Sequence, residues 1–141
     1  MISVFVSHSV KDCFIAKSFV KHILNLGLGI ENKEIRCVSA PSNKIPPGRD
    51  WRNSLQKDIK SCKVIFQIIT QNFLESKFCQ YEVGAAWLSE AYIFPLIVDP
   101  ISFSDAGALI EVSEIVKIND SSGLDRIKDI LCSEEGLTLK C

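Results

Sequence analysis

The sequence has little net charge and no long apolar run, and these absences exclude several classes of protein. Its 16 Lys and Arg nearly balance 17 Asp and Glu, which leaves a formal net charge of −1. A chain so balanced has no general attraction to nucleic acid or to an anionic membrane surface. The longest apolar runs, such as residues 93–98, are far shorter than the roughly 20 residues that span a bilayer. The start of the chain has no basic segment before a long apolar stretch, so we expect no secretory signal.

The sequence contains 6 cysteines but no pair of them at the spacing of a zinc site. No two are separated by two residues, and neither His8 nor His22 lies at ligand spacing to any of them, so we expect no metal. Most fall in apolar segments, where cysteine acts as a small hydrophobic residue. We predict reduced, structural cysteines in a cytoplasmic protein, because disulfides are rare in that compartment.

What the sequence does contain is enough apolar material for one domain. Of its 141 residues, 47% are hydrophobic and 23% are charged, which is an ordinary globular composition. A chain of this length corresponds to one domain and can bury a core without disulfides or metals. We expect residues 1–135 to form that domain and residues 136–141 to be a tail or linker stub.

Strand and helix signals alternate along the chain. Short apolar runs predict strands over residues 2–6, 35–38, 64–69, 94–98 and 115–118. Helical spacing of apolar residues predicts helices over residues 10–26, 51–62, 73–91 and from about 121 to 131. Residues 39–49 and 99–111 are expected to be loops, the second with a short helical turn near 105–109.

The helix ends also have sequence signals. Over residues 10–26 the apolar stripe consists of Ile15, Phe19, Ile23 and Leu26. Ser9 is expected to cap this helix, and Gly27 and Gly29 are expected to end it. Ser121 or Ser122 is expected to cap the last helix.

Strand–helix alternation of this length predicts an α/β protein of the flavodoxin-like kind. We expect a three-layer sandwich whose central five-stranded parallel sheet has the order 2-1-3-4-5, with helices on both faces. The loops that leave the first three strands then emerge at the same carboxyl edge, where such folds bind ligands. Those loops hold residues 7–9, 39–51 and 70–82, so we expect these three segments to meet.

The most informative segment is Ser76–Trp87, which reads Ser-Lys-Phe-Cys-Gln-Tyr-Glu-Val-Gly-Ala-Ala-Trp. It places one carboxylate, Glu82, in an otherwise apolar, small-residue helix, and a buried carboxylate is costly unless something uses it. The alternative is a solvated acid near a helix N-terminus, where acids are favoured. The segment resembles the Ser-x-x-Cys-x-x-Glu stretch of Toll/interleukin-1 receptor (TIR) domains. In the enzymatic members of that family, this Glu is the catalytic residue of an NAD-cleaving activity.

Further motifs extend the resemblance over residues 1–133. Residues 4–12, Val-Phe-Val-Ser-His-Ser-Val-Lys-Asp, are similar to the first strand and first loop of TIR domains. Residues 45–51, Ile-Pro-Pro-Gly-Arg-Asp-Trp, resemble the loop after their second strand, and residues 61–76 resemble their third strand and its exit. The run from Cys79 to Trp87 looks like the bacterial, NAD-cleaving branch rather than the animal adaptors.

The chemistry that this resemblance implies needs only one carboxylate. Ordinary glycosidases use two, because the leaving alkoxide must be protonated. The nicotinamide nitrogen of NAD+ is already cationic, so nicotinamide leaves as a neutral molecule without a general acid. Glu82 alone can accept hydrogen bonds from the ribose hydroxyls and face the developing positive charge. The resemblance thus implies an NAD+ nucleosidase that gives nicotinamide and ADP-ribose or a cyclic variant, with NAD+ as substrate and no cofactor.

Residues near the expected carboxyl edge are candidates for binding NAD+: Ser7, His8, Ser9, Ser39, Arg49, Trp51 and Cys79. The first loop would offer hydrogen bonds, and Arg49 would meet the pyrophosphate at a helix start. Cys79 lies one helical turn before Glu82. Structural roles are the alternatives: Trp51 and Trp87 as core anchors, His8 as a loop hydrogen-bonding group, and Arg49 as a surface charge.

Two rival functions stay open at this point. The first is a non-catalytic TIR–TIR interaction module in signalling, which would use the loop of residues 39–49. The second is a flavodoxin-like nucleotide-processing enzyme such as a nucleoside deoxyribosyltransferase, which also sets a Glu against a ribose. For the catalytic function, the resemblance implies bacterial antiphage immunity, a homotypic, filament-like TIR assembly, and a fused or separate sensor domain as activator.

Overall fold

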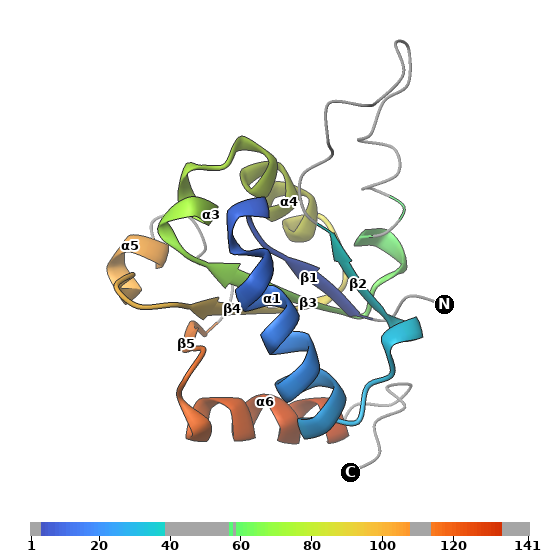
Figure 1. Ribbon diagram of the computed structural model, residues 1–141. Coiled ribbons are helices and arrows are strands. Elements are labelled where there is room, and N and C mark those ends of the chain that lie inside the picture. Colours follow the sequence, from blue (N-terminus) through green and yellow to red (C-terminus); the bar gives the residue numbers. More distant parts are fainter. Residues whose placement is uncertain (1–3, 39–56, 58, 108–113, 134–141) are drawn as a thin grey trace.

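A five-stranded parallel sheet forms the centre of the molecule. The computed structural model describes residues 4–38, 57, 59–107 and 114–133 (Figure 1). The strands are β1 (Val4–Ser7), β2 (Ile35–Val38), β3 (Val64–Ile69), β4 (Tyr92–Ile97) and β5 (Val116–Lys117). Their order in the sheet is β2-β1-β3-β4-β5, and every neighbouring pair is parallel. The predicted flavodoxin-like fold and strand order are confirmed.

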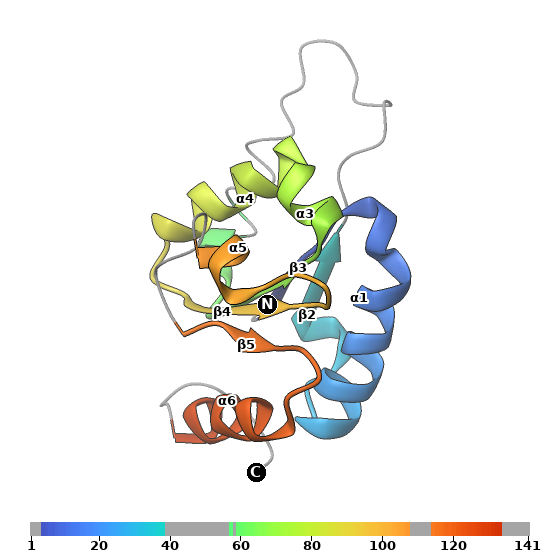
Figure 2. The ribbon, with the colours of Figure 1, turned by 90° about the vertical axis from the view of Figure 1, so that its left-hand side faces the viewer.

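Helices cover both faces of this sheet. They are η1 (Val10–Asp12), α1 (Cys13–Phe19), η2 (Val20–Gly27), η3 (Asn32–Glu34), α3 (Gln71–Glu75), α4 (Lys77–Trp87), α5 (Phe103–Gly107) and α6 (Ser121–Ser133). In Figure 2, α3, α4 and α5 lie on one side of the sheet and α6 lies on the other. None of the helices in the described residues is long and apolar enough to cross a membrane.

The face of the sheet under α1, η2 and α6 carries the largest apolar cluster of the described residues. Side chains of alternate strand residues, such as Val6 and Phe66, pack there against Phe19 and Leu24 from the first helices and Ile127 from α6. The Phe66 ring meets Phe19 edge-on at 5.2 Å between centroids. Burial of this cluster is the main stabilising term on this side.

The opposite face, under α3, α4 and α5, is mixed. Apolar residues form two clusters there, one around Ile69, Phe73 and Val83 and one around Phe5 and Ile65. Residues at even and odd positions of a strand point to opposite faces. The polar residues Ser7 and Gln67 therefore share this face with Phe5, Ile65 and Ile69.

The first predicted helix has a different internal geometry from the one expected. Its second half, η2, is a π-helix, with hydrogen bonds such as Leu28 N–H to the Ile23 carbonyl at 2.9 Å. The wider turn shifts the phase of the apolar stripe. Leu24 and Leu28 are buried, whereas Leu26 is 74% exposed. The prediction of Leu26 as a core residue is therefore wrong, while Gly27 ends the helix as predicted.

The helix that carries Glu82 also differs from its prediction. A single helix over residues 73–91 was expected, but Ser76 has an extended backbone and separates α3 from α4. Its hydroxyl accepts a hydrogen bond from the Cys79 N–H at 3.2 Å and so caps α4. Trp87, the last residue of α4, is 51% exposed. The prediction of Trp87 as a core anchor is wrong, because the smaller Ala86 fills the inward position of that turn.

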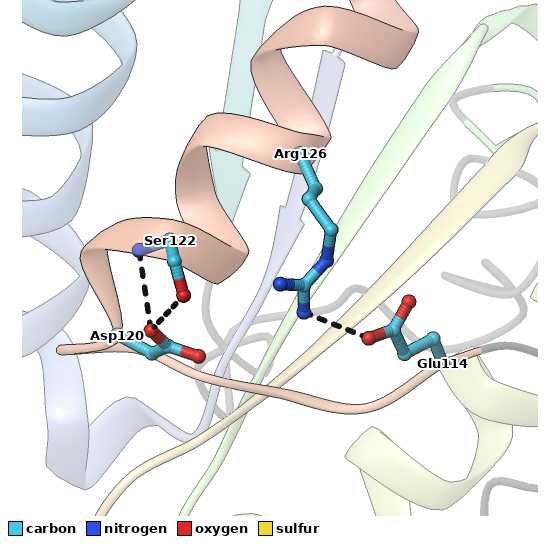
Figure 3. A network of polar contacts seen from close by, with 4 residues as sticks. All are labelled: Glu114, Asp120, Ser122 and Arg126. Carbon is cyan, nitrogen blue, oxygen red and sulfur yellow. Dashed lines mark hydrogen bonds and ion pairs between the residues drawn. The ribbon is translucent and has the colours of Figure 1, made fainter.

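The start of α6 is capped by a residue that the sequence pattern did not single out. Helix α6 begins at Ser121, and the Asp120 carboxylate accepts hydrogen bonds from the N–H and the hydroxyl of Ser122 (Figure 3). Asp120, rather than Ser121 or Ser122, thus supplies the capping oxygen. One turn on, Arg126 forms a 2.8 Å ion pair with Glu114. This pair is largely exposed and contributes little stability.

The described cysteines are not all free thiols. Cys13, Cys37, Cys62 and Cys79 are free, as predicted, whereas Cys132 is disulfide-bonded. The prediction of reduced cysteines is therefore wrong for Cys132. Its apolar setting on α6 gave no sign of a partner, because disulfide pairing depends on spatial approach rather than on local sequence.

Candidate active site

Two of the three predicted loops meet at the carboxyl edge of the sheet. Strands β1 and β3 are neighbours, with Ser7 opposite Gln67 in the register. The segments that leave these strands are joined through Asp12, which lies 58 residues from Thr70 and 60 from Asn72. The loop after β2, residues 39–51, lies outside the described residues. The predicted meeting of the first and third loops is confirmed.

Asp12 is a buried carboxylate whose oxygens are both occupied. The Thr70 hydroxyl donates to its Oδ2 and the Asn72 amide donates to its Oδ1 at 3.0 Å. The Thr70 oxygen in turn accepts the Phe73 N–H at 3.1 Å and caps α3. Ser9 takes part locally, since its carbonyl accepts the Asp12 N–H at 2.9 Å. Asp12 thus ties the first loop to the start of α3.

Glu82 is a second buried carboxylate near the same edge, and its oxygens accept no hydrogen bond from the described residues. The side chain is 2% exposed, on the helix face that α4 turns to the sheet with Cys79, Val83 and Ala86. No described residue donates a hydrogen bond to either of its oxygens. The burial of Glu82 is confirmed, and the alternative of a solvated helix acid is wrong.

Burial controls the protonation of Glu82. Removal from water raises the pKa of this carboxyl well above its ordinary value, and the nearby Ser7 hydroxyl offsets part of the rise. Ser7 is 1% exposed, and its oxygen has no hydrogen bond of acceptable geometry among the described residues. An ionised Glu82 would therefore require donors or a positive charge that the described protein does not supply.

His8 lies deep in the first loop, next to β2. It is 2% exposed, and its Nδ1 is 3.8 Å from the Cys37 Sγ. Burial lowers the pKa of the imidazole, although a backbone hydrogen bond at Val6 and the Asp12 carboxylate partly oppose this. Partial desolvation raises the pKa of the Cys37 thiol to about 11, although the residue as a whole is exposed. At neutral pH both side chains are uncharged, so neither supplies a positive charge that would stabilise an ionised Glu82.

The remaining predicted residues divide into two groups. Cys79 is 1% exposed within the apolar cluster of Phe73 and Val83, and burial raises the pKa of its thiol to about 12. It therefore packs beside Glu82 as a neutral side chain. Ser39, Arg49 and Trp51, by contrast, lie outside the described residues. Their assignment to NAD+ binding stays a prediction.

Sequence reasoning missed two features of this edge. Gln67 is a lone polar residue in a buried six-residue strand, and that contrast was the available signal. The contacts of Asp12 with Thr70 and Asn72 had no local signal, because they join segments far apart in the chain. Among the described residues, no group of three or more His, Cys, Asp or Glu could hold a metal ion.

A cavity elsewhere in the molecule lacks comparable chemistry. It has a volume of about 370 Å³ and lies between α6 and the strands β4 and β5, lined by residues such as Phe94, Val116 and Ile127. Its polar groups of note are Glu114 and Arg126, which pair with each other. It contains none of the residues around Glu82. Size alone therefore does not make it the better candidate.

Sequence comparison places the chain in a family that fits this geometry. Residues 4–129 match the family of TIR domains, and the chain belongs to that family. The uncharacterized protein YddK of Bacillus subtilis (strain 168) is 23% identical over 137 residues, which are 97% of this chain and 51% of that protein. The chain thus spans about half the length of this curated relative.

One solved structure of the family supports the fold. The TIR domain of the Toll-related receptor TRR-2 from Hydra magnipapillata is similar with a TM-score of 0.58 at 12% identity, covering 92% of this chain and 99% of that one. The TIR domains of the activated Roq1 resistosome, which recognises the effector XopQ, are similar with a TM-score of 0.48 at 21% identity. That match covers 70% of this chain and 58% of the other, and it is too weak to support a conclusion.

Proposed function

We propose that this TIR domain is an NAD+ nucleosidase of the bacterial NAD-cleaving type, with Glu82 as its catalytic residue. The observation that carries the proposal is the state of this carboxylate. It is 2% exposed, and no described residue gives it a hydrogen bond. A protein does not retain such a group in its interior for stability, because burial of an unpartnered carboxyl is unfavourable.

The proposed reaction supplies what Glu82 lacks. Ribose hydroxyls donate hydrogen bonds to a carboxylate, and the positive charge that develops at the anomeric carbon stabilises the ionised form. The bond between that carbon and the nicotinamide nitrogen breaks, and its electron pair leaves with neutral nicotinamide. Water then adds and releases a proton, which gives ADP-ribose, or adenine N1 adds and gives the cyclic product. No general acid or metal takes part.

The biological setting follows from the same proposal. An enzyme that consumes NAD+ must be held inactive until it is needed, and a domain of this size leaves little room for its own sensor. We assign its activation to homotypic TIR–TIR assembly, filament-like, under a fused or separate sensor domain. The proposed role is bacterial antiphage immunity in the cytoplasm. Isolated, dilute protein should then be nearly inactive.

The test is NAD+ turnover by concentrated protein, with and without a crowding agent, followed by chromatography of the products. We expect nicotinamide release that falls at least about 100-fold in Glu82→Gln and Glu82→Ala. Glu75→Gln is the matched control, since Glu75 is exposed at the end of α3, and it should keep the wild-type rate. Equal turnover in Glu82→Gln and wild type would refute the assignment of Glu82.

A non-catalytic interaction module is a second candidate, favoured by one observation. At the end of α4, Trp87 is 51% and Leu88 is 91% exposed, a pair suited to contact with another protein. Such a module would show no turnover at any concentration and would assemble equally well with Glu82→Ala. Deoxynucleosides offered in the same assay test the deoxyribosyltransferase alternative, which predicts base exchange rather than NAD+ cleavage.

A further inference from the structure

The outer face of α4 is apolar and open to solvent. The helix turns one set of residues to the sheet: Cys79, Glu82, Val83 and Ala86. Large side chains lie away from the sheet, where Tyr81 is 57% exposed and Trp87 and Leu88 are also exposed. Aromatic residues are enriched where proteins contact one another, and an exposed apolar cluster marks such a surface. This face is therefore a candidate contact for another protein chain.

Gly84 is the centre of this face. Its neighbours one helical turn away in either direction, all of them exposed, are Gln80, Tyr81, Trp87 and Leu88. A Cβ atom on Gly84 would meet nothing within 4 Å, so the described protein does not require glycine here. Glycine inside a helix is less stable than alanine. Gly84 thus leaves a depression among larger side chains at a cost to α4, and that cost is offset where a second molecule enters the depression.

The arrangement around Gly84 is similar in both directions along the helix. In a two-fold symmetric contact, residue i of one copy meets residue j of the other, and j meets i. Two antiparallel copies of α4 that cross at Gly84 would set Tyr81 against Leu88 and Gln80 against Trp87, each pair twice. With glycine at the crossing point, the helix axes can approach to about 8 Å, the close end of the range for packed helices. The outer face of α4 is thus complementary in shape to itself.

The charges at the ends of α4 are complementary to an antiparallel copy as well. Lys77 is the first residue of the helix, and Glu90 lies just beyond its end. Each is unfavourable there, because a helix N-terminus attracts negative charge and a C-terminus attracts positive charge. Both are exposed, and neither forms an ion pair with another described residue. A second, antiparallel α4 would bring its C-terminal end and its Glu90 to Lys77, and its N-terminal end and its Lys77 to Glu90.

We propose that two copies of this chain pair through α4, antiparallel and with Gly84 at the crossing point. Lys77 of each copy pairs with Glu90 of the other, and the apolar side chains around Gly84 close the contact. The inference rests on the self-association in the proposed function and names the surface that carries it. Because the partner is an identical copy in a two-fold arrangement, the pair is closed. Filament growth would therefore need a second contact elsewhere on the domain.

The pairing accounts for the concentration dependence that the proposed function expects. The outer face of one helix is a small contact, and interfaces below about 1,200 Å² are typical of weak, transient complexes. The pair should therefore form in concentrated protein and dissociate in dilute protein. Helix α4 presents this contact on its outer face and Glu82 on its inner face. Formation of the pair would hold the helix that carries Glu82, which links self-association to the candidate site.

Sedimentation equilibrium of the full chain, from micromolar to millimolar concentration, tests the pairing. We expect wild type to pass from monomer to dimer within this range. Gly84→Gln fills the depression and should raise the dissociation constant of the dimer at least about tenfold. In dilute protein its melting temperature should equal or exceed that of wild type, because glutamine is the better helix former. Asp129→Gln, exposed on α6, is the matched control and should leave the dissociation constant unchanged.

A charge exchange tests the antiparallel direction. Lys77→Glu and Glu90→Lys each set like charges against each other twice in the symmetric pair, so each should weaken pairing about three- to tenfold. The two changes together restore opposite charges and should recover most of the lost affinity. Lys128→Glu on α6, across the sheet from α4 (Figure 2), should have no effect. Losses that add in the double variant would exclude the antiparallel arrangement.

The same samples separate this inference from the proposed function. Wild-type protein that stays monomeric at millimolar concentration would overturn the pairing. So would a dimer that Gly84→Gln and Lys77→Glu leave unchanged, since it would form through another surface. NAD+ turnover is an independent measurement. A dimer without turnover would count against the nucleosidase and leave the pairing standing, whereas turnover that follows dimer formation across the variants would support both.

Discussion

Asp12 and Glu82 are two buried carboxylates near one sheet edge, and their surroundings are opposite. Asp12 accepts hydrogen bonds from Thr70 and Asn72 and joins two loops. Glu82 accepts none from the described residues, although it is the more deeply buried, at 2% exposed against 7%. A buried carboxylate thus stabilises the fold at Asp12 and destabilises it at Glu82.

The difference teaches how to separate a structural acid from a functional one. A structural carboxylate contributes stability because the protein supplies its donors. A functional carboxylate is kept with its hydrogen-bonding capacity unused, at a cost in stability, until a ligand supplies the donors. Substitution should therefore destabilise the fold at Asp12, and under the proposed function it should reduce NAD+ turnover at Glu82.

The largest effect on stability is expected from Asp12→Ala. The change leaves the Thr70 hydroxyl and the Asn72 amide without their acceptor and unlinks the first loop from α3. We expect a loss of about 3 kcal/mol in the free energy of unfolding, or roughly 6 to 12 °C in melting temperature. Urea denaturation measures it. Asp12→Asn, which keeps one acceptor oxygen, should lose less; an equal loss would show that charge rather than hydrogen bonding matters here.

Glu82→Gln is expected to have the reverse effect on stability. Because the pKa of Glu82 is raised in the folded state, wild-type stability falls as pH rises from about 4.5, where the unfolded carboxyl titrates, toward the folded value. Glutamine has no such titration. The variant should match wild type near pH 4 and be more stable by about 1 to 3 kcal/mol at pH 8. Melting temperatures across this pH range measure the difference in stability between the variant and wild type. A difference that narrows as pH rises would contradict a buried Glu82 without hydrogen-bond partners.

Asn72→Ala sharpens the comparison by removing one donor only. Asp12 keeps its bond from Thr70, and the helix cap of α3 is untouched. We expect a loss of about 1 kcal/mol, the net contribution of one hydrogen bond, measured by urea denaturation. Gln71→Ala, exposed on the same helix, is the control. A loss as large as that of Asp12→Ala would show that the two donors act as one unit.

The smallest effect on stability is expected from Trp87→Ala. Trp87 is 51% exposed at the last position of α4 and takes no part in the hydrogen bonds of Asp12. Its removal should change the free energy of unfolding by no more than about 0.5 kcal/mol. Sedimentation measured beside the unfolding curve should show weaker self-association if this residue contacts a second copy. A fall in stability above 2 kcal/mol would mean that Trp87 anchors the core after all.

Much of the fold was predictable because its signals are local. A parallel strand buried on both faces is a continuous apolar run, as in β3, and strand–helix alternation then restricts the topology. The burial of Glu82 was predictable from the small apolar residues around it. The contacts of Asp12 were not, because Thr70 is 58 residues away. The π-helical turn that exposes Leu26 was also not predictable, because the apolar spacing of residues 15–26 fits an ordinary α-helix.

The pairing of β1 with β3 determines at which stage of synthesis and folding the candidate site can form. Ser7 and Asp12 are made early in synthesis, but Gln67, which is the register neighbour of Ser7, and Thr70, which donates to Asp12, come about 60 residues later. Contacts so distant in sequence form only once the intervening chain has closed. A nascent or truncated chain that ends before β3 therefore holds half of the candidate site and lacks Glu82. If Glu82 consumes NAD+, the cell is protected from the enzyme until its fold is complete.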